Sequence, residues 1–137
     1  KHVTIEVSDA QFIADTVSTL EVATRLRLKG FGLALDNFGR SGAGPHRLQQ
    51  TPFTEIKIDR EFVHGCATSA SSRSVVEATL AQARRLGVVT VAEGVNDRAD
   101  WNLLKELGCD QAQGFFIARP MPENGLETWA AQWKARQ

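Results

Sequence analysis

The chain has 137 residues, 42% of them hydrophobic and 23% charged, which is the composition of a single soluble globular domain with a buried core. Its 16 basic and 16 acidic residues cancel, which argues against binding DNA through bulk positive charge, and we expect no DNA partner. No apolar run approaches the roughly 20 residues that cross a bilayer, so we expect this chain to make no membrane contact.

The first half of the chain alternates short β-branched or apolar runs with one helical segment. Residues 3–7, 32–36 and 55–59 are typical of strands. A helix that stops at Gly30 is predicted by apolar residues spaced three and four apart: Ile13, Val17, Leu20 and Ala23 or Leu26. Between the second and third strands we expect a glycine-rich loop, from Gly39 to Pro45, and a short helical turn over residues 46–50.

The second half continues the same alternation. A helix that Gly87 closes is predicted by the apolar face Val76, Leu80, Ala83 and Leu86. A strand over residues 88–92 ends at Glu93, and Asp97 and Asp100 form a capping-box-like start for the next helix. That helix has a predicted buried side of Trp101, Leu104 and Leu107 and stops at Gly108. A short strand over 111–116 and a final helix with Leu126, Trp129, Ala130 and Trp133 on one face complete an α/β pattern typical of a parallel sheet.

Acidic residues lie at or near the ends of four predicted strands: Glu6, Asp36, Asp59 and Glu93. The carboxyl ends of parallel strands form the functional edge of such folds, and converging carboxylates repel one another unless a cation neutralises them. Oxygen ligands of this kind suit Mg²⁺ or Mn²⁺. Lys57 shares a strand face with Asp59 and could orient a phosphate or a water, and Gln113 could add an amide.

Several of these residues also have simpler interpretations. Any one strand-end acid could be a helix cap, and the glycines at 39, 42 and 44 lack the lysine-serine pattern of a phosphate loop. His2, His46 and His64 are expected on the surface, and Trp129 and Trp133 are expected to pack in a core or an interface. Cys66 and Cys109 lack disulfide or metal spacing, which indicates reduced thiols in a cytoplasmic protein.

Taken together, the motifs resemble those of the EAL domain family, the cyclic di-GMP phosphodiesterases of bacterial signalling, from Val3 to about Pro122. The matching segments are Glu6-Val7-Ser8-Asp9, Asp36-Asn37-Phe38-Gly39, Lys57-Ile58-Asp59-Arg60-Glu61-Phe62-Val63, Ala92-Glu93-Gly94-Val95, and Gly108-Cys109-Asp110 with Gln113-Gly114-Phe115 and Arg119-Pro120. The resemblance implies a TIM-like (β/α) barrel that hydrolyses cyclic di-GMP to pGpG with Mg²⁺ or Mn²⁺.

The resemblance also assigns roles to individual residues. The metal positions would be Glu6, Asp36, Asn37, Asp59 and Glu93. Lys57 would hold water or phosphate, Gln113 would complete the polar shell, and Asp9 would support the loop after Asp36 from behind the ligands.

The chain departs from the family pattern in four places. Asn37 stands where active members have a second aspartate, residues 40–45 differ from the usual loop, and Asp9 replaces a glutamate. The Glu-Ala-Leu segment, which precedes the position of Val3 in the family, is not in the sequence. We therefore expect residues 1–137 to be a single partial EAL domain, an incomplete barrel of about five to six βα units that does not hydrolyse the nucleotide alone.

Three functions remain open at this point. The protein could be a phosphodiesterase, completed by homo-oligomer formation or by other domains of a longer parent protein. It could instead bind cyclic di-GMP or a protein partner without hydrolysis, which Asn37, the altered loop and Asp9 favour. A scaffold that binds no nucleotide is disfavoured because it would have no need of clustered carboxylates.

Overall fold

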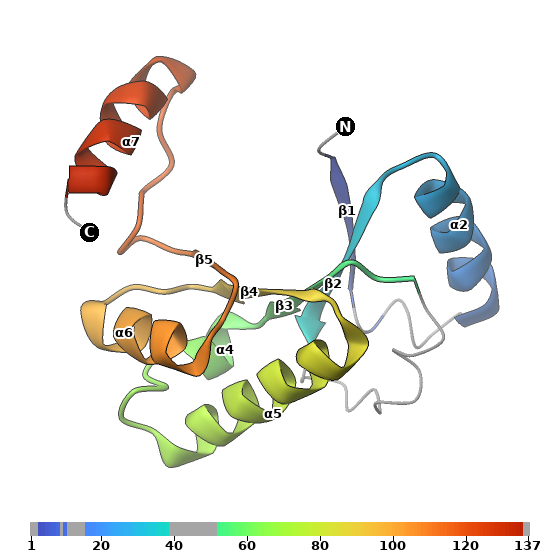
Figure 1. Cartoon of the computed structure of the whole chain (residues 1–137), viewed down its shortest axis with the longest axis horizontal. Coiled ribbons are helices and arrows are strands. Elements are labelled where there is room, and N and C mark those ends of the chain that lie inside the picture. The colour runs from blue at the N-terminus through green and yellow to red at the C-terminus, as the bar shows by residue number, and fades with distance from the viewer. Residues whose placement is uncertain (1–2, 9, 11–15, 39–51, 136–137) are drawn as a thin grey trace.

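The computed structural model describes residues 3–8, 10, 16–38 and 52–135 (Figure 1). Its elements are β1 (Thr4–Ser8), α2 (Thr16–Leu28), β2 (Gly32–Phe38), β3 (Glu55–Ile58), α4 (Arg60–Val63), α5 (Ala70–Leu86), β4 (Val89–Glu93), α6 (Arg98–Leu107), β5 (Gln111–Gln113), the 3-10 turn η1 (Glu123–Gly125) and α7 (Leu126–Ala135). The predictions for Asp9, Ile13, His2, His46, the glycine-rich loop and the turn at 46–50 lie outside the described residues. Within the described residues no helix has the length and apolar character needed to span a membrane.

The five strands form one parallel sheet in the order β1-β2-β3-β4-β5. Strands that follow one another in the chain are therefore neighbours in the sheet, and the described strand order never reverses. A doubly wound sheet has a point where the order switches, whereas a TIM-type barrel winds in one direction. The predicted α/β fold of TIM-like type is confirmed, with five of the eight strands of a closed barrel described.

Helices α2, α4, α5 and α6 cover one face of the sheet, and α7 lies away from the sheet (Figure 1). Leu33, Leu35 and Ile56 point to that face and pack against Ala23 of α2 and Ala83 of α5. A second cluster joins strand residues to α5 and α6 through Ile58, Ala92, Val76, Leu80 and Leu104. Because side chains alternate along a strand, the remaining strand positions point to the opposite face.

The helix stops predicted from glycine are observed. Gly87 ends α5 with φ 65° and Gly108 ends α6 with φ 75°, both in the left-handed region that glycine adopts without strain. The predicted inner face of α5 is also confirmed, with Leu86 partly buried beside it. Val17, expected on the inner face of α2, is 81% exposed. Six residues at about 100° each put Val17 about 120° around the helix from the buried Ala23, so the two cannot face the sheet together.

Helix α7 packs through aromatic side chains. The rings of Trp129 and Trp133 stack with centroids 6.1 Å apart, and Trp133 meets Trp101 and Phe116 edge-on at 5.6 and 6.0 Å. The Trp129 indole also donates a hydrogen bond to the Ile117 carbonyl at 3.1 Å. The packing predicted for the two tryptophans is confirmed. Leu126, expected on the same face, is 52% exposed because the aromatic contacts involve later turns of the helix.

Candidate functional site

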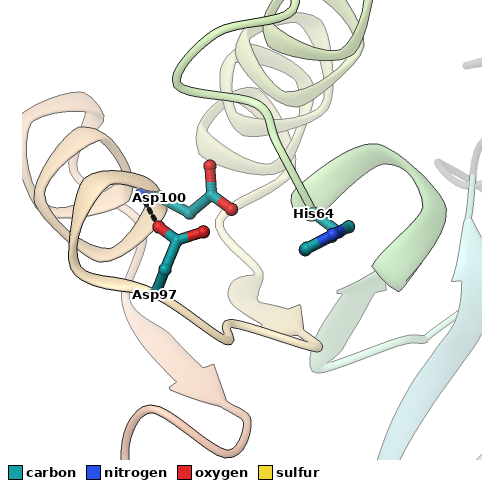
Figure 2. A group of neighbouring side chains, drawn as sticks. All are labelled: His64, Asp97 and Asp100. Atoms are coloured by element: carbon teal, nitrogen blue, oxygen red, sulfur yellow. Dashed lines mark hydrogen bonds between the residues drawn. The ribbon is translucent and has the colours of Figure 1, made fainter.

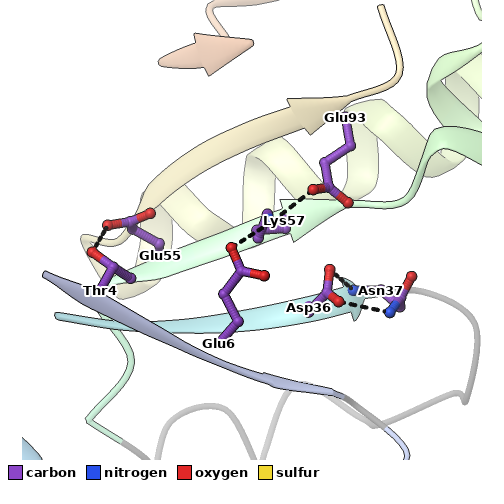
Figure 3. Close-up of polar contacts among 7 residues, drawn as sticks. All are labelled: Thr4, Glu6, Asp36, Asn37, Glu55, Lys57 and Glu93. Carbon is purple, nitrogen blue, oxygen red and sulfur yellow. Dashed lines mark hydrogen bonds and ion pairs between the residues drawn. The ribbon is translucent and has the colours of Figure 1, made fainter. Parts of the chain in front are cut away.

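The face of the sheet away from the helices carries most of the charged strand residues. We call it the polar face, and its members include Thr4, Glu6, Ala34, Asp36, Glu55, Lys57, Val91, Glu93 and Gln113. The register sets Glu6 beside Ala34, Lys57 beside Val91, and Glu93 beside Gln113. Figure 3 shows the carboxylates and Lys57 gathered over this face. The predicted convergence of Glu6, Lys57 and Glu93 is therefore observed.

Lys57 joins two of the carboxylates. Its Nζ lies 2.6 Å from Glu6 Oε1 and 2.7 Å from Glu93 Oε1 (Figure 3). Strands β1 and β3 are two places apart, or about 9.5 Å, so this bridge needs two long side chains. Ala34 on the intervening strand is small and leaves room for them. The bridge thus links β1, β3 and β4 at one point on the polar face.

The charge of Lys57 is set by its surroundings. Its side chain is only 10% exposed, whereas the side chains of Glu93 and Glu6 are 24% and 54% exposed. Burial by itself lowers the pKa of Lys57, but hydrogen bonds and electrostatic attraction from Glu6 and Glu93 outweigh burial, and the pKa is raised. The ammonium therefore stays protonated at neutral pH and supplies a fixed positive charge among the carboxylates.

A second link crosses the strands at their other end. Thr4 Oγ1 donates a hydrogen bond to Glu55 Oε1 at 2.9 Å (Figure 3). Gly32 pairs with Thr4, and a Cβ there would come 2.6 Å from Thr4 Oγ1. The missing side chain at Gly32 makes room for this contact. Glu55 thus has a structural partner at the opposite end of the strands from the carboxyl ends.

Strand β2 contains a β-bulge at Asp36 and Asn37. Leu35 pairs with Ile56 and Phe38 pairs with Ile58, so β2 has one extra residue. Asn37 takes up the irregularity with φ 58°, a left-handed conformation that asparagine tolerates better than most residues. Its backbone N–H donates to Asp36 Oδ1 and its Nδ2 donates to Asp36 Oδ2, both at 2.9 Å (Figure 3). Both predicted metal positions are half-buried at the bulge.

Asp59 is a helix cap, which is one of the two roles that the sequence allows for a strand-end acid, the other being a metal ligand. The predicted strand over 55–59 ends at Ile58, and the 3% exposed Asp59 caps the short helix α4, accepting a hydrogen bond from the Glu61 N–H at 2.8 Å. Helix α4 is not among the predicted elements, although an aspartate before four non-breaking residues is a helix-start signal. A cation-binding role for Asp59 stays a prediction. So does the role of Gln113, which is exposed on β5.

A second acidic cluster, missed from the sequence, lies beside the loop after α4. Ligand atoms of His64, Asp97 and Asp100 lie within 4.8 Å of one another (Figure 2). Asp97 caps α6 as predicted, and His64 is exposed as predicted. The carboxylate of Asp100 was expected to complete a capping box at the start of α6. It accepts hydrogen bonds from the Gly65 and Ala67 N–H groups instead, at 2.8 and 3.0 Å.

Asp100 is therefore a clamp for this loop. It is 1% exposed, and the thiol of Cys66 also donates to it at 3.5 Å. Burial, with the nearby Asp100 charge, raises the pKa of Cys66 to about 12, so the thiol stays protonated. Both Cys66 and Cys109 are free cysteines. Because protein groups already use both Asp100 oxygens, the cluster has a structural explanation.

An open cavity of about 580 Å³ adjoins the carboxyl ends of β3 and β4. It is lined by Arg60, Glu61, His64, Gly94 and Asn96. Gly94 has φ 73°, and a Cβ there would lie 2.5 Å from the Arg60 Cβ, so a glycine is required for the two segments to approach. This cavity begins one residue after Asp59 and Glu93, at the edge of the sheet where ligands bind in α/β barrels.

Comparison with known proteins agrees with this geometry. The EAL domain model matches residues 1–120. RocR of Pseudomonas aeruginosa, a cyclic di-GMP phosphodiesterase, is 42% identical over 121 residues, covering 88% of this chain and 31% of RocR.

Solved structures give the same result. The PaMucR phosphodiesterase in complex with c-di-GMP has a TM-score of 0.85 at 34% identity, covering 90% of this chain and 50% of that one. BlrP1 of Klebsiella pneumoniae, in a complex with manganese and cyclic di-GMP, has a TM-score of 0.80 at 32% identity over 86% of this chain and 30% of that one. Because the family model covers most of its length and close relatives share its fold, the chain belongs to the EAL domain family and is related to the cyclic di-GMP phosphodiesterases of bacterial signalling.

Proposed function

We propose that the protein binds cyclic di-GMP through a divalent cation held on the polar face and hydrolyses one of its phosphodiester bonds. The observation that carries this proposal is the Lys57 bridge, which brings Glu6 and Glu93 to the same ammonium group. The chain spans 31% of the length of RocR, so the activity is proposed for the whole protein. That the chain alone does not turn the nucleotide over stays a prediction.

The side chains present suit a hard divalent cation. Glu6, Asp36 and Glu93 offer carboxylate oxygens on one face of the sheet, which is the donor set that Mg²⁺ and Mn²⁺ prefer. Lys57 brings one positive charge to the two carboxylates of Glu6 and Glu93, so a bound cation would meet negative charge that the ammonium does not balance. A bound cation would polarise a phosphoryl oxygen and lower the pKa of a coordinated water. Asp59 and Gln113 are proposed as further contributors.

Lys57 and the adjoining cavity would hold the nucleotide. The Lys57 ammonium stays charged at neutral pH and can hold a phosphate oxygen or a water in place. Arg60 and His64 line the cavity with N–H donors suited to a phosphate or to acceptor atoms of a base. The cavity volume of about 580 Å³ is within the usual range for small-molecule sites.

A second candidate function is binding of cyclic di-GMP without hydrolysis. The specific observation in its favour is Asn37, whose amide donates to Asp36 where a second acidic ligand would add negative charge. A neutral amide is a weaker ligand for a hard cation than a carboxylate. Such a protein would act as a receptor that binds the nucleotide and leaves it intact.

Product analysis separates the two functions. The whole protein is incubated with cyclic di-GMP and Mn²⁺ or EDTA, bound nucleotide is measured, and recovered nucleotide is identified by chromatography. The test variant is Glu93→Gln, and the matched control is Glu77→Gln, an exposed glutamate on α5 that pairs with Arg73 one helical turn away. Mn²⁺-dependent pGpG that Glu93→Gln abolishes supports hydrolysis, and Mn²⁺-dependent binding of intact nucleotide supports the second candidate. No binding and no conversion with Mn²⁺ would contradict both.

A further inference from the structure

The carboxylate of Asp36 is hydrogen-bonded by the residue that follows it, Asn37. Both oxygens of the Asp36 carboxylate accept a hydrogen bond from Asn37, one from its backbone N–H and one from its side-chain amide, each at 2.9 Å. Figure 3 shows the amide nitrogen turned to the carboxylate and the amide oxygen turned away from it. Hydrogen bonds to a charged acceptor are among the stronger ones in proteins, so this pair is stable in its observed arrangement.

The bulge fixes this arrangement. Asn37 is the extra residue of β2 relative to β3, and its left-handed backbone is imposed by the register on either side. The bulge therefore brings the Asn37 side chain next to the Asp36 carboxylate. A second carboxylate there would have no hydrogen to donate, and two adjacent carboxylates repel each other, which a cation or another positive group between them would relieve.

We propose that Asn37 takes the place of a second cation at Asp36, so that the Asp36 carboxylate is held without that ion and the whole site uses one divalent cation fewer than a site with two adjacent acids. The amide makes Asn37 a positioning residue: it holds the Asp36 carboxylate in place before any cation binds. The statement about the number of cations rests on the proposed function. The statement about stability without metal rests only on the contacts between Asp36 and Asn37.

Substitutions at the two positions test the proposal. Asn37→Asp removes the donor and adds a charge, whereas Asn37→Gly removes the donor but keeps the left-handed backbone without strain. In EDTA at pH 7 we expect the folding equilibrium constant of Asn37→Asp to be roughly tenfold below that of Asn37→Gly. This is the size of effect that one nearby like charge has when it shifts a pKa by about one unit. The exchanged pair, Asp36→Asn with Asn37→Asp, again has one amide and one carboxylate and should recover most of this loss.

Cation binding provides an independent readout. Bound Mn²⁺ is counted by electron paramagnetic resonance, and we expect Asn37→Asp to bind one more ion per chain than the wild type. We also expect Mn²⁺ to raise the unfolding midpoint of Asn37→Asp more than that of the wild type. Equal stability of Asn37→Asp and Asn37→Gly in EDTA, with equal Mn²⁺ counts in Asn37→Asp and wild type, would overturn the inference. If the wild type bound no Mn²⁺ while Asn37→Asp was destabilised in EDTA, the role of Asn37 would stand and the proposed cation site would fail.

Discussion

Replacing Lys57 by methionine tests the central contact of the polar face. The substitution keeps the length of the side chain and its packing but removes the ammonium that bridges Glu6 and Glu93. The two carboxylates are then left without their shared positive group. We expect the protein to lose stability, and we expect the loss to divide unequally between the two contacts because the glutamates differ in burial.

The size of the loss follows from the exposure of each partner. Glu93 is 24% exposed against 54% for Glu6, so the Glu93 contact is the more shielded from water. Breaking a fully buried ion pair costs about 3–5 kcal/mol, and a solvent-exposed pair contributes about 0.2–1 kcal/mol. The Glu93 contact falls between these limits, at about 2 kcal/mol, and the Glu6 contact near the lower one, at about 0.5 kcal/mol. Lys57→Met should thus lower the free energy of unfolding by about 2–3 kcal/mol.

Double-mutant cycles in urea measure both contacts. Lys57→Met is combined with Glu93→Gln and with Glu6→Gln, in EDTA at pH 7, and Lys105→Met on α6 is the matched control on the surface. The raised pKa of Lys57 means that its contribution is fully present below pH 10.5 and is lost only as the pH rises through the higher folded value, so pH 7 measures all of it. A coupling energy near zero with both glutamates, or a larger one with Glu6 than with Glu93, would refute the reasoning.

Three further predictions concern residues outside the polar face. Asp100→Asn removes a carboxylate that accepts two backbone hydrogen bonds, and we expect the free energy of unfolding in urea to fall by about 3 kcal/mol. A decrease no larger than that of an ordinary surface substitution would contradict the role of Asp100 in holding the loop. Hydrogen bonds from Thr90 lower the pKa of Asp110, so the contribution of Asp110 to stability is present above pH 3.8 and is lost as the pH falls through its lower pKa in the folded protein. In Asp110→Asn the free energy of unfolding should therefore fall less steeply at acidic pH, and an unchanged pH dependence would contradict this prediction. The Cys66 thiol, with its pKa raised to about 12, should not react with a thiol reagent at pH 8 until the protein unfolds, and rapid reaction of the native protein would disprove its burial.

The strands, the helices and the general place of the site could be predicted from local patterns. Alternation along residues 55–59 put Lys57 on a face with other polar residues, and the glycine stops fixed the ends of α5 and α6. These features depend on side chains a few positions apart, which the sequence displays directly. Two steps of three residues, from Val17 to Leu20 to Ala23, turn away from a single helix face, and this is why the prediction for Val17 is wrong.

The contacts that give the site its character could not be predicted in this way. The Lys57 bridge depends on the register of β1, β3 and β4, which no local pattern determines. The bulge at Asn37 arises where β2 pairs with β3, and the Asn37 amide contacts Asp36 there. Asp100 is a capping residue by spacing, yet its carboxylate turns to a loop about 35 residues earlier in the chain.

Calorimetric titration of the protein with cyclic di-GMP, first with Mn²⁺ and then with EDTA, tests most directly whether the polar face is a cation-dependent nucleotide site. We predict saturable binding with Mn²⁺ that EDTA removes and that Glu93→Gln weakens at least tenfold, or about 1.4 kcal/mol. Binding that is the same in EDTA and in Glu93→Gln, or no binding with Mn²⁺, would contradict this account of the polar face.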